Sequence, residues 1–301
     1  MKEISCIFCG IPSDNPVIEE NGFIGKRCLE CGLIYISPRP TQDEIIDLYG
    51  HNSAHISAQE HISDEYRKRL YARHHLGKLK KFAEGGQILE IGAGAGFFLD
   101  EARKLGFDPF GLEFNPHQAG FMRNHLGIPC IEKPLSTDIF NGKRFDVIYH
   151  CDVISHLYDP LFDFKVMNSL LKDHGILFFE TGNFAEMDQS YYSYIPTFMY
   201  PDHLFFFGLN NLKTLLEKTG FELIYTKRYS IFPQLWLKSK FGNHQGQKND
   251  VHEFHQTGNR NNGLVEKLKV RVNYGMRYYA GAVSPKQNRP QTILICARKK
   301  L

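Results

Sequence analysis

Short apolar runs alternate with amphipathic stretches from about residue 86 to the C-terminus. Such runs suit buried strands, because a strand covered on both faces carries apolar side chains at consecutive positions. We expect strands at 88–91, 109–113, 128–132, 144–150, 175–183, 221–227 and 291–298. Between them apolar residues recur at helical spacing, which predicts helices over 97–105, 116–127, 160–174 and 210–220. Strands that alternate with helices are typical of α/β proteins with a doubly wound parallel sheet.

The first of these strands leads directly into a turn with three glycines, Gly92, Gly94 and Gly96. Glycines let the backbone approach a ligand that a Cβ would exclude, and a strand, a glycine turn and a helix together form a nucleotide-binding unit. A dinucleotide fingerprint needs its third glycine at position 97, which here is Phe97. Glu90, just before the turn, is better suited to a cationic ligand than to a pyrophosphate. Hydride transfer with a dinucleotide is therefore disfavoured.

An acidic residue ends the second predicted strand. Glu113 lies roughly 20 residues beyond the glycine turn, where a carboxylate reads the two hydroxyls of a ribose. The alternative is a solvated glutamate at a strand end. Asn115 and Pro116 then form the N-cap and first position of the next helix, which Gly127 ends. The position of Glu113 predicts a ribose-containing ligand beside the turn.

Four of the seven cysteines form two C-x-x-C-G knuckles near the N-terminus. Cys6 and Cys9 make the first knuckle, and Cys28 and Cys31 make the second. Two such pairs about 15–20 residues apart are typical of a four-cysteine zinc site. Four thiolates leave no open position on the metal, so we expect structural zinc in a small ribbon. Redox-active or unused thiols are the alternative.

The composition is that of an ordinary globular protein. The 301 residues are 42% hydrophobic and 23% charged, with a formal net charge of +3, which is too small to argue for nucleic acid or a membrane surface. The length allows one large α/β domain and a small appendage. Residues 1–30 lack the apolar core of a signal peptide, and no run approaches the roughly 20 apolar residues of a membrane span. We therefore expect a cytoplasmic protein with reduced cysteines.

Two motifs resemble those of the class I S-adenosylmethionine (SAM) methyltransferases. The first is E-x-G-x-G-x-G over 90–96, and the second is D-V-x-x-H-x-x-D-P over 152–160, although Ser155 stands where relatives commonly have an acid. The resemblance implies a Rossmann-like, seven-stranded doubly wound sheet whose final strand lies antiparallel between the fifth and the sixth. It also implies SAM as the cofactor, with Asp152 near its methionine or adenine end. The cofactor-binding residues would be Glu90, Gly92, Ala93, Gly94, Gly96, Glu113 and Asp152.

The zinc ribbon and the connector S-P-R-P-T that follows it are similar to a widespread group of methyltransferases that carry such a ribbon. Thr41 and Glu44 predict a capping box after the connector. We expect three parts, namely a zinc ribbon and linker at 1–45, a SAM-binding domain at 46–230 with 290–301, and a partly disordered insertion or cap at 231–289.

Three polar stretches have more than one interpretation. The segment 51–62, with His51, His55 and His61, is typical of a lid or entry loop, since nothing in the spacing of the histidines selects a metal site. The predicted helix 63–82 has a basic side that is either a solvated face or a cradle for an anionic substrate. The segment 242–263 is typical of a disordered loop, and a basic amphipathic helix is expected at 264–279.

A later segment resembles the sugar site of deoxysugar C-methyltransferases, which also carry a zinc ribbon. Tyr200-Pro-Asp-His203 matches their Y-x-(D/E)-H pattern, which implies that Tyr200, Asp202 and His203 line the acceptor site. Proton abstraction has been placed there in that family. We expect His203 first and His156 second as the proton acceptor, because an imidazole titrates near neutral pH. Tyr200 and Asp202 would position the substrate or the base.

The sequence therefore predicts a SAM-dependent methyltransferase. Its acceptor would be a small molecule, a sugar or an anionic nucleotide-sugar, methylated on oxygen or carbon. One alternative is an RNA- or protein-modifying methyltransferase in which the ribbon recognises the macromolecule, and the modest net charge speaks against nucleic acid. The other is a non-catalytic SAM-binding module. No feature of the sequence indicates an oligomeric state.

Overall fold

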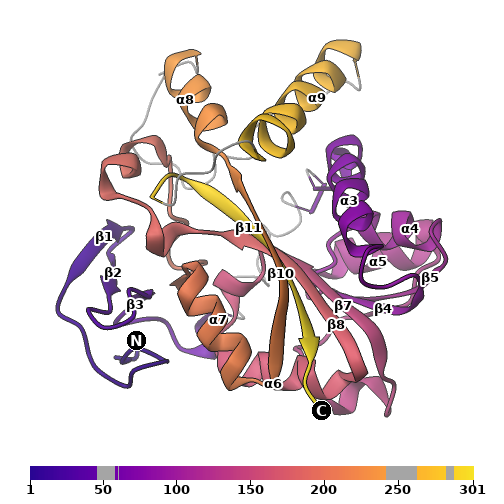
Figure 1. Ribbon diagram of the computed structural model, residues 1–301, viewed down its shortest axis with the longest axis horizontal. Coiled ribbons are helices and arrows are strands. Elements are labelled where there is room, and N and C mark those ends of the chain that lie inside the picture. The colour runs from indigo at the N-terminus through magenta and orange to yellow at the C-terminus, as the bar shows by residue number, and fades with distance from the viewer. Residues whose placement is uncertain (46–57, 60, 242–262, 283–287) are drawn as a thin grey trace.

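The computed structural model describes residues 1–45, 58–59, 61–241, 263–282 and 288–301, which form two sheets (Figure 1). The larger sheet has seven strands in the order β10-β11-β8-β7-β4-β5-β6. β4 pairs in parallel with β5 and β7, whereas β11 lies antiparallel between β8 and β10. This order confirms the predicted Rossmann-like sheet, including the position of its last strand. The strands are β4 (Gly86–Ile91), β5 (Phe107–Leu112), β6 (Cys130–Ile131), β7 (Phe145–Cys151), β8 (Leu171–Gly182), β10 (Phe221–Ser230) and β11 (Gln291–Lys299).

Helices cover both faces of this sheet (Figure 1). One face carries α3 (Glu65–Leu79), α4 (Phe97–Arg103) and α5 (Pro116–Leu126), and the other carries α6 (Pro160–Leu170) and α7 (Leu209–Lys218). Consecutive strand residues therefore enter different cores: Ile88 packs with the α3 face and Leu89 with the α6 face. This explains the continuous apolar runs, because successive side chains of a strand point to opposite faces.

Local signals set most helix ends. Asn115 caps α5 by accepting from the backbone N–H groups of His117 and Gln118, and Gly127 ends it with a φ of 63°. Two expectations were wrong. The helix expected to reach residue 174 ends at Leu170, because Leu171 turns into extended backbone and pairs with Phe145 at the start of β8. The helix predicted over 97–105 ends at Arg103, so Leu105 lies beyond α4 and is 43% exposed.

The N-terminal ribbon is joined to the larger domain by strand pairing. It contains β1 (Pro16–Glu20), β2 (Phe23–Arg27) and β3 (Ile34–Ile36), and its fourth strand is β9 (Phe205–Phe206), which comes from far along the chain. The smaller sheet therefore crosses the boundary expected near residue 45. Thr41 and Glu44 form the expected capping box, with Glu44 Oε2 accepting from the Thr41 N–H at 2.7 Å.

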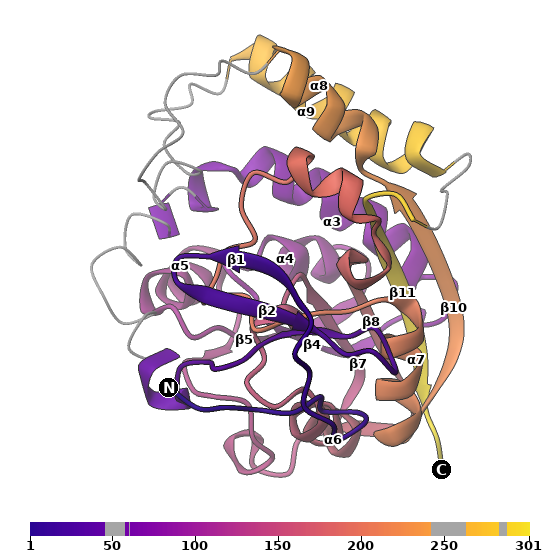
Figure 2. The same ribbon diagram turned by 90° about the vertical axis from the view of Figure 1, so that its left-hand side faces the viewer.

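Two helices lie above the α3 side of the sheet (Figures 1 and 2), and both belong to the expected insertion. They are α8 (Phe232–Phe241) and α9 (Leu264–Tyr278), and α9 packs against α3 through aromatic contacts of Tyr71 with Tyr274 and Tyr278. The predicted loops at 51–62 and 242–263 lie largely outside the described residues. Among the helices of the described ranges, none is long and apolar enough to cross a bilayer.

We expect replacement of one core histidine to flatten the pH dependence of stability. His150 on β7 is fully buried, stacked on Phe179 with ring centroids 4.6 Å apart, and neither ring nitrogen has a hydrogen-bond partner among the described residues. Burial lowers the pKa of His150 to about 3. Because this pKa lies below that of the unfolded chain, the unfolded state binds the proton first, and stability falls as the pH drops from about 6.5 towards 3. The loss at pH 5 is about 2 kcal/mol.

Urea unfolding at pH 7.5 and pH 5.0 tests this expectation. His150→Phe removes the buried, unpaired nitrogens and loses less stability between the two pH values than the wild type. The exposed His174 provides the control variant His174→Asn, which keeps the wild-type difference. Comparison within each variant cancels any change in packing. Equal pH dependence in His150→Phe and the wild type would contradict the assignment.

Candidate active site and metal centre

The glycine turn has a backbone that other residues would strain. Gly92, Gly94 and Gly96 have φ values of 66°, 55° and 81°. A Cβ on Gly92 would lie 2.7 Å from Val153 Cγ2, and one on Gly96 would lie 2.6 Å from Met122 Cγ. The turn is therefore fixed by glycines, and Gly96 opens α4. The contact with Val153 also places the loop after β7 against the turn.

Glu113 is bonded to this turn. Its carboxylate accepts from the Gly94 N–H at 2.7 Å and from the Asn115 N–H at 2.8 Å. Each oxygen can accept a further hydrogen bond, because a carboxylate oxygen has two lone pairs. The position fits the predicted contact with a ribose, since the carboxylate and the glycine backbone form one surface.

Glu90 presents a buried carboxylate oxygen without a protein partner. The residue is 6% exposed, and Oε2 has no hydrogen-bond partner among the described residues. Burial raises the pKa of Glu90 well above its usual value, against a smaller opposing effect of Lys68. A cationic ligand at this place would stabilise the ionised carboxylate. The buried carboxylate of Glu90 thus fits SAM, which carries a positively charged sulfonium and an ammonium group.

Asp152 stands directly after β7 with a φ of 55°, an uncommon conformation for a residue with a side chain. Its N–H donates to the Glu180 carbonyl at 2.9 Å, which fixes the loop to β8. Strained residues of this kind concentrate at functional sites. The predicted cofactor-binding residues therefore lie together at the carboxyl ends of β4, β5 and β7, where open α/β sheets bind ligands.

The structure brings three of the predicted catalytic residues together. His156 Nδ1 lies 3.1 Å from Asp202 Oδ1, and the rings of His156 and His203 are 4.6 Å apart, edge to face. Burial, with a smaller contribution from His156, lowers the pKa of His203 to about 4. Burial lowers the pKa of His156 as well, but Asp202 outweighs it and the net shift is upward. The surroundings therefore shift the pKa values of the two imidazoles in opposite directions.

Tyr200 points towards the ribbon. It is 1% exposed, and a Cβ on Gly25 of β2 would lie 2.0 Å from its hydroxyl oxygen. The ribbon also holds its backbone, because Glu20 accepts from the Tyr200 N–H at 2.8 Å and Asn21 Nδ2 donates to the Tyr200 carbonyl at 2.8 Å. The ribbon thus fixes the turn that carries Asp202 and His203.

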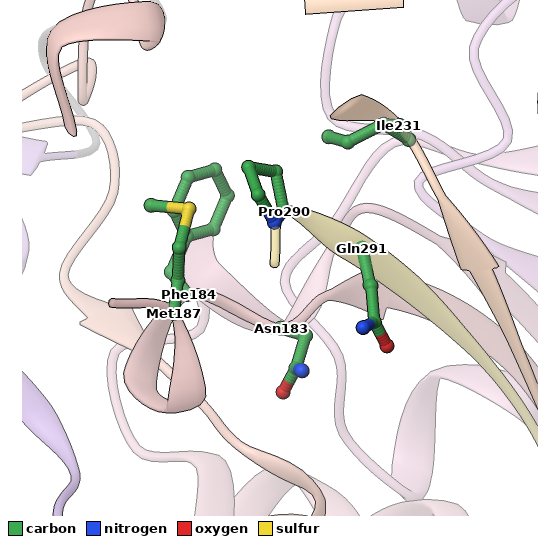
Figure 3. A pocket seen from close by; sticks show the side chains of 6 residues that line it. All are labelled: Asn183, Phe184, Met187, Ile231, Pro290 and Gln291. Carbon is green, nitrogen blue, oxygen red and sulfur yellow. The ribbon is translucent and has the colours of Figure 1, made fainter. Parts of the chain in front are cut away.

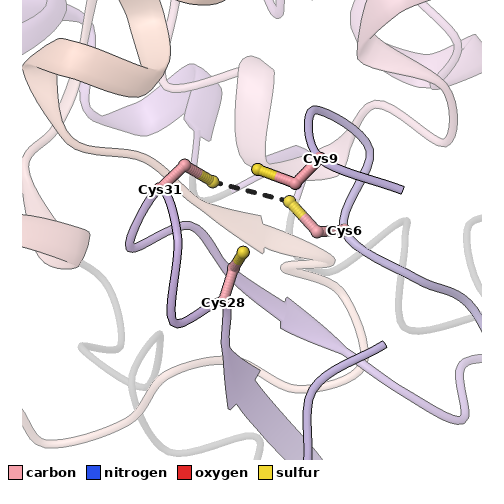
Figure 4. Close-up of side chains that lie close together, drawn as sticks. All are labelled: Cys6, Cys9, Cys28 and Cys31. Atoms are coloured by element: carbon pink, nitrogen blue, oxygen red, sulfur yellow. Dashed lines mark hydrogen bonds between the residues drawn. The ribbon is translucent and has the colours of Figure 1, made fainter. Parts of the chain in front are cut away.

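The four predicted metal ligands converge (Figure 4). Their sulfur atoms all lie within 4.8 Å of one another, with Cys6 and Cys31 Sγ 3.5 Å apart. A tetrahedral zinc with Zn–S bonds of about 2.3 Å needs sulfurs about 3.8 Å apart. The knuckles have the same geometry, since the N–H groups of Gly10 and Gly32 donate to the carbonyls of Cys6 and Cys28 at 2.8 and 2.9 Å. The arrangement fits a structural zinc ion.

Several contacts carry no sequence signal that would have identified them. Part of the basic side of α3 is used internally, since Arg69 pairs with Asp100 at 2.5 Å and Arg73 pairs with Glu101 at 2.7 Å. Asn183, in the polar exit of β8, is 1% exposed, and its amide atoms have no hydrogen-bond partner among the described residues. Figure 3 shows it in a small pocket at the carboxyl end of β8, lined by Asn183, Phe184, Met187, Ile231, Pro290 and Gln291.

Comparisons with known proteins identify the family of the chain. The profile of a family described as "Methyltransferase domain" matches residues 63–226. A ubiquinone biosynthesis O-methyltransferase of Cereibacter sphaeroides is 29% identical over 109 residues, covering 33% of this chain and 42% of the relative. Another, from Actinobacillus pleuropneumoniae, is 27% identical over 109 residues, covering 33% of this chain and 47% of the relative. The match spans less than half the length of these relatives.

Solved structures share the fold at low sequence identity. A complex of the Haloferax volcanii Trm112 methyltransferase activator and a methyltransferase gives a TM-score of 0.52 at 14% identity, over 83% of this chain and 97% of that chain. Phosphoethanolamine N-methyltransferase 2 of Haemonchus contortus, in complex with SAM, gives a TM-score of 0.50 at 16% identity. The match covers 89% of this chain and 62% of that chain. At these identities the likeness supports the fold alone.

Proposed function

This chain belongs to the SAM-dependent methyltransferases whose family profile it matches, and we propose that it moves a methyl group to an oxygen or carbon of a sugar or nucleotide-sugar. The observation that carries the proposal is the cluster of His156, Asp202 and His203. His156 comes from the loop after β7, which packs against the glycine turn through Val153, and Asp202 and His203 come from the turn before β9. Polar groups that can handle a proton thus stand on the acceptor side of a nucleotide-binding turn.

The cofactor-binding half of the proposal rests on the carboxyl ends of β4 and β5. Glu113 would bind the ribose, Glu90 would face a positive group, and the glycine backbone would allow close approach. SAM supplies an electrophilic methyl carbon on a good leaving group. The protein then has mainly to align the acceptor with that carbon, which proximity and orientation alone can make worth about 7–11 kcal/mol.

The acceptor half rests on the histidine cluster. His203 Nδ1 is buried and has no hydrogen-bond partner among the described residues, so it can accept a proton from an acceptor hydroxyl or an acidic C–H. Asp202 orients His156, and Tyr200 positions the turn from the ribbon side. The relatives are named as ubiquinone biosynthesis O-methyltransferases, which supports an oxygen of a small molecule as the methylated atom.

Calorimetric titration with SAM tests the cofactor site. We expect micromolar binding by the wild type and at least about tenfold weaker binding by Glu113→Ala, because that variant loses the ribose contact and the bonds that hold Gly94. Glu217→Ala, at an exposed position of α7, serves as the matched control and keeps the wild-type affinity. NAD gives no binding. Absence of SAM binding by a folded, zinc-loaded protein would refute the proposed cofactor site.

A panel of acceptors tests the reaction. Mass spectrometry of mixtures with SAM should show methylation of a nucleotide-sugar and not of RNA. His203→Ala is expected to lower the rate by about 10²-fold or more, with unchanged SAM affinity. Methylation of RNA or of a protein would favour the macromolecular alternative. Tight SAM binding without turnover on any acceptor would favour the non-catalytic module.

A further inference from the structure

We propose that His156, Asp202 and His203 bind a divalent cation, forming a second metal site that is separate from the four-cysteine centre. One ligand atom from each side chain lies within 4.8 Å of the other two. The three residues come from two places in the chain, the turn η2 (Ile154–His156) after β7 and the turn before β9. Two imidazoles and one carboxylate favour a first-row divalent ion such as Mn²⁺, Fe²⁺, Co²⁺ or Zn²⁺.

The third member distinguishes this cluster from a simple ion pair. His156 and Asp202 already satisfy each other at 3.1 Å, so His203 is not needed for that pair. Yet His203 Nδ1 is buried beside them without a hydrogen-bond partner among the described residues. Its ring is held edge-on against His156 and against Phe206, whose ring centroid is 5.6 Å away. A buried nitrogen that lacks a partner is costly, and a cation would supply the missing interaction.

The backbone around the cluster is fixed before any ligand arrives. The Leu204 N–H donates to the Ser155 carbonyl at 2.8 Å, which ties the two turns together, and the His203 N–H donates to the Met199 carbonyl at 3.0 Å. β9 follows at once and pairs with β3 of the ribbon. Metal sites depend on this kind of support, because the surrounding hydrogen bonds orient the ligands.

One side of the cluster remains open. The side chains of His156 and Asp202 are 28% and 35% exposed, so water or an acceptor can reach a bound ion. Three protein ligands leave such positions on a first-row ion, as in catalytic rather than structural sites. Since the four-cysteine centre has no such position, the two metal sites would have different roles.

The cation would select the acceptor, an inference that rests on the proposed function. Two neighbouring oxygens, as in a vicinal diol or a hydroxy ketone, would chelate the ion and fill its open positions. A bound cation lowers the pKa of an attached hydroxyl, which prepares the acceptor oxygen for methylation. With the ion bound, His203 Nδ1 is a ligand and no longer the proton acceptor, and the proton of the ionised acceptor hydroxyl passes to water at the open side of the cluster.

Manganese binding to the full, zinc-loaded chain tests the site without SAM or acceptor. The EPR signal of free Mn²⁺ should disappear with a stoichiometry of one ion per chain. Asp202→Asn and His203→Ala should each weaken Mn²⁺ binding at least about tenfold, as loss of one ligand implies. The control is His174→Asn, at an exposed histidine near the N-terminal end of β8. We expect this variant to bind Mn²⁺ like the wild type. Zinc content and SAM affinity, measured in every variant, show that the chain is folded.

The outcomes separate the cation site from the proposed function. Mn²⁺ that stays free at millimolar concentration, or binding that survives in both ligand variants, would overturn the cation site, whatever the protein does with SAM. If one Mn²⁺ binds and the two variants lose it, the site stands. The acceptor assignment is then judged separately, by whether chelation of the second ion alone lowers methylation of diol acceptors.

Discussion

Loss of the predicted zinc from the four-cysteine centre is expected to abolish methyl transfer while the seven-stranded sheet stays folded. The reason is the shared sheet: β3 of the ribbon pairs with β9, which begins two residues after His203. Glu20 and Asn21 of the ribbon bind the backbone of Tyr200 in the same turn. Folding of small zinc domains depends on the metal, whose binding free energy is about 10–16 kcal/mol in zinc-finger peptides. Without zinc, the turn with the catalytic candidates loses its support.

Cys28→Ser tests this expectation, with Cys130→Ala as a matched control at a cysteine outside the centre. We expect the first variant to lose zinc and to methylate at least about 100-fold more slowly, because a small misplacement of reacting groups can cost that much in rate. SAM affinity should change little, because the predicted cofactor residues lie at the carboxyl ends of β4, β5 and β7. Hydrogen exchange should show faster exchange in 198–206 than in β7. Full activity in a zinc-free Cys28→Ser protein would mean that the ribbon does not position the acceptor site.

The fold of the larger domain could be predicted because its signals are local. The glycine turn, the apolar strands and the cap Asn115 each act within a few residues, and the structure places them as expected. The predicted end of α6 was also wrong for a local reason. Leu171 is apolar at a position that suits both the helix and β8, so periodicity could not decide between them.

The candidate site could be predicted only as separate pieces. Glu113 and the four cysteines follow fixed spacings, so the sequence could point to their ligands. The approach of His156 to Asp202 joins residues 46 positions apart, and nothing in the spacing marks it. The hydrogen bond between the Glu20 carboxylate and the Tyr200 N–H joins residues 180 positions apart. Such contacts depend on how the ribbon docks, which is determined by tertiary packing.

A buried ion pair that could not be predicted is expected to hold the cap helix α9 in place. Glu180 on β8 is fully buried and pairs with Arg277 of α9 and with His75 of α3, whose Nε2 lies 3.1 Å away. Burial raises the pKa of Glu180, but Arg277 and His75 outweigh it and lower the pKa to about 2. Because this pKa is depressed, the pair stabilises the fold above about pH 4.5, and the contribution is lost as the pH falls towards 2.

Arg277→Met should therefore reduce the free energy of unfolding by about 3–5 kcal/mol at pH 7, since it leaves a buried carboxylate without its main partner. Arg271→Met, at an exposed arginine of the same helix, is the control and should change it by less than about 0.5 kcal/mol. Adding Glu180→Gln to Arg277→Met should recover part of the loss, because the uncompensated charge is removed. The Glu180 carbonyl also holds the N–H of Asp152, so weaker SAM binding should accompany the loss of stability. Equal costs for Arg277→Met and Arg271→Met in urea unfolding would show that aromatic packing on α3, and not this pair, fixes α9.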